Sequence, residues 1–313
     1  MIQTRIQPLF LPSTGDLFNI RYMKVAHSSN FFFFILVLAG LGISCNKKAT
    51  EPAYLHVEPF KVITNAISEG TSVQYIPEMI LIVDDQPAGV YHLPADIPLL
   101  YSGTHNVRIA PAIIENAIGS NPRYAYTYFA PFDTALTFTP SGSISVTPRI
   151  SYRKNVKFAL LEDFENPNLL LIKTTFNNLD TLLRDSLPAD NLEPGHCGFA
   201  TLNDKVTMEY ATRISYALPS SSSSNTFLEV SYKTELPLAF GIYTFEPGLT
   251  TTDKIPVVTL NEKDGWSKAY INLTNDVSAK STGTVFKLFV AAQNTTGAPK
   301  KVFIDNIKIL YFE

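Results

Sequence analysis

The residue types that most often carry catalysis or hold metals are few and scattered in this sequence. The five histidines are isolated, with neither an H-E-x-x-H pattern nor the Cys and His spacing of a zinc site. The chain has no G-x-S-x-G nucleophile elbow, no phosphate-binding loop and no dinucleotide fingerprint. The adjacent acids Asp84 and Asp85 stand in the stretch DDQPAG, where turn chemistry accounts for them. The sequence therefore predicts a protein that is not an enzyme and has no organic cofactor, with a carboxylate pair from distant strands as the open alternative.

The stretch Phe31–Cys45, FFFFILVLAGLGISC, is the clearest single signal in the chain. It is shorter than the about 20 apolar residues of a membrane-spanning helix and has the length of a signal-peptide core. Arg21 and Lys24 supply a positively charged flank before it. Because residues 1–22 do not look like a leader, we expect Met23 to be the true start of a compact one.

The end of that run, GISC, resembles the lipobox of bacterial lipoproteins. In that family the leader is cut just before the cysteine, and its thiol and the new N-terminus are acylated. The resemblance implies that residues 1–45 contain the leader and that lipid on Cys45 holds the protein at a membrane. Each buried acyl methylene contributes about 0.8 kcal/mol, and more than one chain gives stable attachment. The alternative is an uncleaved signal anchor with a buried thiol.

Removal of residues 1–45 leaves 268 residues, enough for one large or two medium domains. The leader holds three basic residues and one acidic residue, so 22 basic and 27 acidic residues remain, with a net charge of −5. This balance argues against a nucleic-acid partner. Cys197 is then the one remaining cysteine, so no internal disulfide is expected, and we predict that it is a small buried residue.

Residues 46–53 are expected to form a short tether, and residues 54–153 an all-β unit. Within that unit Met79–Val83 and Val90–Leu93 read as a hairpin around the DDQPAG turn. The segment ILIVDDQPAGVYHLPADIPLLYSGTHNVRI resembles PEGA-type or immunoglobulin-like β-sandwiches. This resemblance implies a spacer or attachment module without catalysis.

Residues 156–313 contain about ten short strand-like segments separated by turn residues, which is typical of a sandwich or jelly roll. Asp264 and Gly265 are among the predicted turns. In the predicted strand Thr226–Thr234, apolar and polar residues alternate, so we expect it to be buried on one face only. The predicted fold class is all-β, with an immunoglobulin-like N-terminal sandwich followed by a jelly roll.

Three stretches of this second unit, FALLEDFENPN, DGWSKAYINLT and KVFIDNIKILYFE, resemble the galactose-binding-like jelly roll of many carbohydrate-binding modules. The whole arrangement also resembles two-domain lipoproteins of Gram-negative bacteria. That resemblance implies an outer-membrane lipoprotein that faces the periplasm or the cell surface.

The jelly-roll resemblance also implies a structural calcium beside the paired first and last strands. The matching oxygen ligands are Glu162, Asp163, Glu165 and Asp305, and calcium takes six to eight oxygen ligands. The alternative is that these are solvated edge carboxylates, with Asp305 capping a turn.

Four aromatic residues are candidates for stacking on a sugar ring: Tyr216, Tyr243, Phe245 and Trp266. Tyr243 and Phe245 precede a Pro-Gly loop, and Tyr216 lies near a run of five serines. Trp266 is the only tryptophan, and its place at the head of a strand also suits a core residue. Our first hypothesis is a non-enzymatic, lipid-anchored envelope protein that binds polysaccharide. The alternatives are an accessory subunit that binds envelope proteins and, less favoured, a jelly-roll hydrolase.

Overall fold

The computed structural model describes residues 51–176, 182–186 and 195–313. The leader, Met23, Cys45 and most of the predicted tether lie outside the described residues. Residues 51–313 form one compact unit by their contacts, so the expected division near residues 153–156 stays a prediction. Its regular structure is nearly all strand, which confirms the all-β class. The helical elements are α2 (Ala66–Glu69), α3 (Thr274–Ser278) and the 3-10 turn η1 (Ser222–Ser224).

In the described part of the chain, no helix has the length and apolar character needed to cross a membrane.

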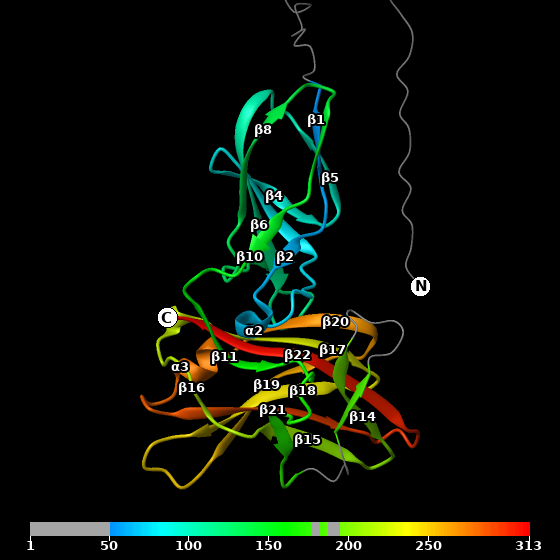
Figure 1. The fold of residues 1–313 in the computed structure, drawn as a ribbon, viewed down its shortest axis with the longest axis vertical. Coiled ribbons are helices and arrows are strands. Elements are labelled where there is room, and N and C mark those ends of the chain that lie inside the picture. Colours follow the sequence, from blue (N-terminus) through cyan, green and yellow to red (C-terminus); the bar gives the residue numbers. More distant parts are fainter. Residues whose placement is uncertain (1–50, 177–181, 187–194) are drawn as a thin grey trace, which may run out of the picture. The chain divides into compact units, whose positions relative to one another are not determined.

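The N-terminal part is a β-sandwich of three small sheets (Figure 1). Its strands are β1 (Ala53–Val57), β2 (Lys61–Ile63), β3 (Glu78–Val83), β4 (Gln86–His92), β5 (Ala95–Leu99), β6 (Gly103–Ile114), β7 (Arg123–Ala125), β8 (Phe132–Phe138), β9 (Ser143–Val146) and β10 (Arg149–Ser151). The sheets have the orders β5-β1-β9, β10-β2 and β4-β3-β6-β7, with β8 also on β6. The predicted hairpin is β3–β4, and Asp84 and Asp85 form its turn with φ of 48° and 61°. Positive φ at both central residues is what a type I′ turn requires.

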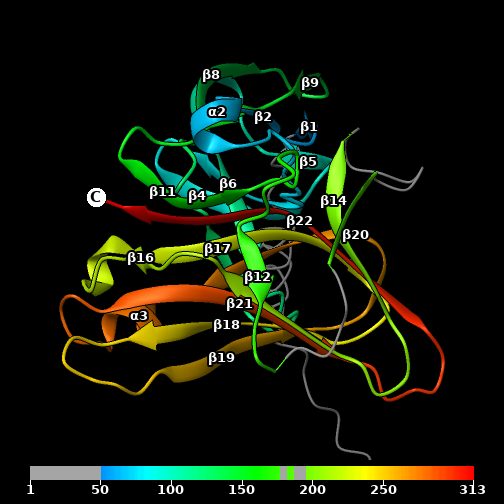
Figure 2. The same ribbon diagram turned by 60° about the horizontal axis from the view of Figure 1, so that its bottom comes forward.

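The C-terminal part is a jelly-roll sandwich of two six-stranded sheets. Its strands are β11 (Val156–Glu162), β12 (Leu171–Lys173), β13 (Leu183–Ser186), β14 (His196–Leu202), β15 (Thr207–Thr212), β16 (Tyr216–Ala217), β17 (Thr226–Thr234), β18 (Leu238–Phe245), β19 (Asp253–Leu260), β20 (Lys263–Asn272), β21 (Val285–Gln293) and β22 (Lys300–Phe312). One sheet, here called the junction sheet, has the order β13-β14-β22-β17-β20 with β11 on β22. The other, the open sheet, has the order β12-β15-β21-β18-β19 with β16 on β21. The two sheets lie face to face in Figure 2.

The main core fills the space between the junction sheet and the open sheet. Leu228, Val230 and Ile304 from one sheet pack with Phe240 and Leu288 from the other. Cys197 is fully buried, as predicted. Side chains alternate along a strand, so each sheet also has an outer face, and the two outer faces lie on opposite sides of the jelly roll.

The N-terminal sandwich packs on the outer face of the junction sheet (Figure 1). A second apolar cluster joins them, with Tyr126 and Tyr128 on one side and Phe227, Tyr270 and Leu310 on the other. This contact overturns the expectation that Thr226–Thr234 is buried on one face only. Glu229 and Ser231, on its polar face, are both 0% exposed.

The predicted turn at Asp264 and Gly265 is also wrong. Both residues lie within β20, which begins at Lys263. Strand β20 pairs with β17 through a register shift between Tyr232 and Thr234. Such a bulge lets a strand run on past residues that locally favour a turn.

Candidate functional site

The four predicted aromatic residues do not come together. Tyr243 and Phe245 alternate with core residues on β18, so both lie on the outer face of the open sheet. Tyr216, on β16, packs against the main core instead. Trp266 is half-buried on β20 of the junction sheet, beside Phe303 and outside the main core.

A buried carboxylate organises the surface around Tyr243. Glu209, on β15, is 2% exposed and accepts hydrogen bonds from the Tyr243 hydroxyl and the Lys254 ammonium. The Thr174 hydroxyl donates a third hydrogen bond to it at 3.0 Å. These donors come from three different segments of the open sheet and its edge, so Glu209 fixes their side chains relative to one another.

Aromatic rings surround the Lys254 ammonium. Its nitrogen lies 4.9 Å from the ring centre of Phe176 and 4.8 Å from that of Phe289. The Phe289 ring is 5.2 Å from that of Tyr243. A cation in contact with aromatic faces is attracted by their negative electrostatic potential. Phe176 is 62% exposed, so an apolar ring faces solvent beside a fixed charge.

Gly241 is what allows Phe289 to lie close against the sheet. A Cβ at this position would stand 2.2 Å from the Ile255 carbonyl oxygen and 2.5 Å from the Phe289 ring. Real Cβ atoms do not approach that closely, so any other residue would displace the ring or the neighbouring strand. Glycine inside a strand often marks such a close approach.

The charges of this cluster are set by its contacts. Burial favours the neutral form of Glu209, but hydrogen bonds from Lys254, Tyr243 and Thr174 outweigh it and hold the pKa of the carboxyl below its usual range. Burial and the adjacent Glu209 carboxylate raise the pKa of Tyr243, so its phenol is neutral at physiological pH. The surface offers the Lys254 ammonium, the neutral Tyr243 phenol and the exposed Phe176 ring, arranged around the buried Glu209 carboxylate. This set suits stacking and hydrogen bonding to a polar ring compound.

The predicted calcium ligands are occupied by hydrogen bonds within the chain. Glu162 accepts from the backbone N–H groups of Phe164 and Leu170, at 2.9 and 2.6 Å. Glu165 accepts from the backbone N–H of His196 at 2.7 Å and contacts its ring nitrogen at 3.2 Å.

The other two predicted calcium ligands also bond to backbone. Asp163 accepts from the Glu165 N–H at 3.1 Å, and Asp305 from the Asn306 N–H at 2.7 Å. Burial raises the pKa of Asp305 to about 8, and the carboxylates of Asp163 and Glu165 add to the shift. Within the described ranges, no three Asp, Glu, His or Cys side chains converge as a metal site. A calcium site that relies on backbone carbonyls stays a prediction.

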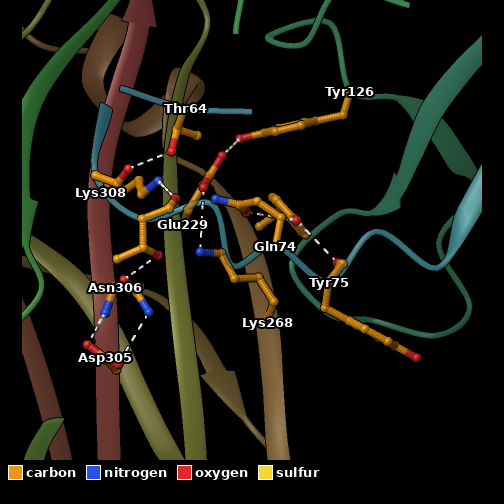
Figure 3. A network of polar contacts seen from close by, with 12 residues as sticks. Thr64, Gln74, Tyr75, Tyr126, Glu229, Lys268, Asp305, Asn306 and Lys308 are labelled. Atoms are coloured by element: carbon orange, nitrogen blue, oxygen red, sulfur yellow. Dashed lines mark hydrogen bonds and ion pairs between the residues drawn. The ribbon is translucent and has the colours of Figure 1, made fainter. Parts of the chain in front are cut away.

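A buried polar network links the two β parts (Figure 3). Glu229 accepts hydrogen bonds from the hydroxyls of Tyr126 at 2.7 Å and Tyr152 at 2.9 Å, and the Lys268 ammonium lies 3.6 Å from it. Lys308 donates to the Thr71 carbonyl at 3.1 Å. Burial raises the pKa of Tyr126 and Tyr152 well above the usual range, and Glu229 adds to this shift. Because these groups are buried, we interpret the network as a structural connection.

Sequence reasoning did not find Glu209, Lys254, Phe176 or Phe289. They come from four separate segments and have no shared motif. One signal was available: Gly241 interrupts the strand-like run LAFGIY, and an isolated glycine in a strand indicates a bulge or a close contact.

Comparisons with known proteins find similar folds and no family. No protein-family model matches the chain, and no curated protein matches it. A carbohydrate-binding module of the β-sandwich superfamily is 14% identical, covers 75% of this chain and 85% of its own, and has a TM-score of 0.36. A xylan-binding domain from Paenibacillus barcinonensis is 12% identical, covering 51% and 98%, with a TM-score of 0.36. The K3 cleaved adhesin domain of Lys-gingipain from Porphyromonas gingivalis is 14% identical, covering 50% and 98%, with a TM-score of 0.32. At these identities and TM-scores, the similarity indicates no ligand for this chain.

Proposed function

We propose that this protein is a non-enzymatic, lipid-anchored protein of the cell envelope that binds glycan through the outer face of the open sheet. The observation that carries the proposal is the cluster of Glu209, Lys254, Tyr243 and Phe176. It places the exposed ring of Phe176 and the half-buried ring of Tyr243 beside hydrogen-bonding groups whose positions are already fixed. A sugar ring has an apolar C–H face and a polar rim, so it needs both kinds of contact at once.

Preorganisation supports binding at this surface. Glu209 already holds Tyr243 and Lys254 in place, so a ligand would pay little entropy to order these two side chains. Phe245 extends the same face, and the Lys287 ammonium lies 5.8 Å from the centre of its ring. The candidate surface therefore continues along β18 for at least two outward-facing residues.

The contacts of Glu209 argue against one catalytic role, that of the general acid in glycoside hydrolysis. Its two carboxylate oxygens accept hydrogen bonds from Thr174, Tyr243 and Lys254. A general acid in glycoside hydrolysis needs a raised pKa, whereas the pKa of Glu209 is lowered. Lipid attachment at Cys45 rests on the lipobox resemblance of the sequence, and location at the outer membrane rests on its resemblance to two-domain lipoproteins of Gram-negative bacteria.

Binding of the purified protein to a glycan array tests this function. We expect at least one class of glycan to bind, and Tyr243→Ala and Phe176→Ala each to weaken it about tenfold or more, as for an aromatic hot spot. Tyr124→Ala is the matched control, because Tyr124 is a 49% exposed tyrosine of the N-terminal sandwich. Glycan binding that is unchanged across the whole array in both variants would contradict this site. Capture of one defined envelope protein without any glycan response would favour the accessory-subunit alternative.

A further inference from the structure

A row of aromatic side chains crosses the outer face of the junction sheet. Phe199 on β14 pairs directly with Phe303 on β22, and their ring centres are 4.8 Å apart. Lys233 on β17 pairs with Phe303 from the other side, with its ammonium 5.8 Å from the ring centre. Trp266 on β20 continues the row, 6.3 Å from Phe303. The row spans three strand spacings, or about 14 Å.

The fold does not use this row as core. The neighbours of Phe303, Val302 and Ile304, point into the main core, so Phe303 itself points outward. Phe199, Phe303 and Trp266 are all half-buried. The N-terminal sandwich covers the other end of the same face, where Glu229 and Leu310 are fully buried. The aromatic row therefore lies on the part of the junction sheet that remains accessible.

The Trp266 indole provides an independent indication of a ligand. Its Nε1–H is buried and has no hydrogen-bond partner among the residues that the structure describes. Native proteins nearly always satisfy a buried donor, because a donor without an acceptor has lost the hydrogen bond that it makes in water. A ligand oxygen or a bridging water at the row would supply the acceptor.

One hollow adjoins the aromatic row, and a second hollow shares a lining residue with the first. One, of about 280 Å³, is lined by Phe303 and by Lys233, Lys263, Lys301 and Asp264. A second, of about 350 Å³, lies where the N-terminal sandwich meets β20, and Tyr75, Asn116 and Tyr270 are among its lining residues. Lys263 lines both hollows. An elongated ligand could therefore extend from the row toward the junction.

The charge at the first hollow indicates an anionic ligand. Three lysines face two acids there, in a chain whose net charge is −3. One of those acids, Glu235, already accepts a hydrogen bond from the backbone N–H of Lys301 at 2.8 Å. Within residues 51–176, 182–186 and 195–313, neither Lys263 nor Lys301 belongs to an ion pair. Carboxylate or sulfate groups on a ligand would complement these ammonium groups.

We propose that this surface, defined by Phe199, Phe303, Trp266, Lys263 and Lys301, binds an acidic polysaccharide. The rings stack on sugar faces, and the lysines pair with the carboxylate or sulfate groups along the chain. The surface lies on the opposite side of the jelly roll from Tyr243, so it does not depend on the function proposed above. One chain could then carry two separate glycan contacts, whose avidity exceeds that of either one.

Trp266 makes the test direct, because it is the only tryptophan in the chain. The full chain in detergent micelles is titrated with polygalacturonate while tryptophan emission is recorded. We expect a saturable change in emission that weakens as salt is raised, because salt screens the exposed lysines. Laminarin, a neutral glucan, is expected to give a much weaker change, and so is polyglutamate, an anionic peptide.

Variants separate this surface from the first. Lys301→Glu and Phe303→Ala are each expected to weaken the response to polygalacturonate about tenfold or more. Lys287→Glu, a matched charge reversal on the open sheet, and Tyr243→Ala are expected to leave it unchanged. Thermal melting checks the folding of each variant. Lys301 is exposed, so Lys301→Glu is expected to fold and can test the surface even if Phe303→Ala does not fold.

The same titrations show which results would overturn the proposal. No saturable emission change with polygalacturonate, or an undiminished change in Lys301→Glu, contradicts the site. An equal response to laminarin contradicts an acidic ligand, and an equal response to polyglutamate contradicts a glycan. A Tyr243→Ala protein that loses part of its array binding but keeps the Trp266 response to polygalacturonate would show that the two surfaces act separately.

Discussion

Tyr126 in the N-terminal sandwich donates a 2.7 Å hydrogen bond to Glu229 in the jelly roll, and both side chains are buried. Tyr152 donates to the same carboxylate, and Lys268 faces it at 3.6 Å (Figure 3). These partners are far apart in the chain, and Tyr126 and Glu229 have a sequence separation of 103 residues. The two β parts are therefore joined by charged and polar groups that are removed from water, as well as by apolar packing.

Replacing Glu229 with glutamine should destabilise the whole described unit. The change removes the negative charge that faces Lys268 and places an amide donor against the tyrosine hydroxyls. Breaking one side of a buried ion pair typically costs about 3–5 kcal/mol. Urea denaturation of Glu229→Gln should show a loss of this order, whereas Glu262→Gln, at an exposed glutamate, should stay within about 0.5 kcal/mol of the parent. Equal stability of the two variants would contradict this role of Glu229.

Stability at low pH should depend on Glu209. Its pKa is lower in the folded state than its usual value near 4.5, so its contribution to stability is fully present above that value. The contribution is lost as the pH falls through the folded-state pKa. The stability difference between the parent and Glu209→Gln, measured by urea denaturation, should therefore shrink as the pH is lowered from neutral to about 3. A difference that stays constant or grows on acidification would contradict this assignment.

Calcium should raise the thermal midpoint if backbone carbonyls complete the predicted site. Glu162, Asp163, Glu165 and Asp305 would supply oxygens, and binding to the folded state alone stabilises it by mass action. Melting curves with calcium and with excess chelator should then differ, and Asp305→Asn should reduce the difference. Asp133→Asn is the control, because Asp133 pairs with Arg108 in the N-terminal sandwich. Identical curves with and without chelator would exclude a stabilising calcium.

The two cysteines allow a matched test of the membrane anchor. Cys45 lies outside the described residues, and Cys197 is fully buried in the jelly roll. Cells grown with a labelled fatty acid should incorporate label into the parent and into Cys197→Ser, but not into Cys45→Ser. The Cys45→Ser protein should also leave the membrane fraction, because the acyl chains would provide its attachment. Label retained by Cys45→Ser would contradict lipidation there.

Local structure could be predicted well from the sequence, because strand patterns and turn residues act over short distances. The predicted strand Thr226–Thr234 has the bounds found for β17, and the predicted hairpin is β3–β4. The hairpin turn is shorter than predicted, because Gln86–Gly89 belong to β4. Asp264 and Gly265 are a second exception. Their local preference for a turn is overridden because β20 pairs with β17 through a bulge.

What covers each face of a strand could not be predicted from the strand alone. Glu229 and Ser231 look solvent-facing in sequence, and only the docking of a distant segment buries them. The same limit applies to the candidate site. Tyr243 was identifiable as an aromatic residue beside a loop, but its partners Glu209 and Lys254 come from strands whose pairing no local pattern reveals.

The apolar cluster beneath the polar network has a consequence for how such a chain can evolve. Phe227, Tyr270 and Leu310 belong to the jelly roll, yet they are covered by residues of the N-terminal sandwich. A gene fragment that encoded the jelly roll alone would produce a protein in which these apolar side chains are exposed to water, because the N-terminal sandwich would no longer cover them. Such an exposed apolar patch favours aggregation. Exchange of either half between genes would therefore be selected against unless both halves moved together. We therefore expect the two β parts to be retained together.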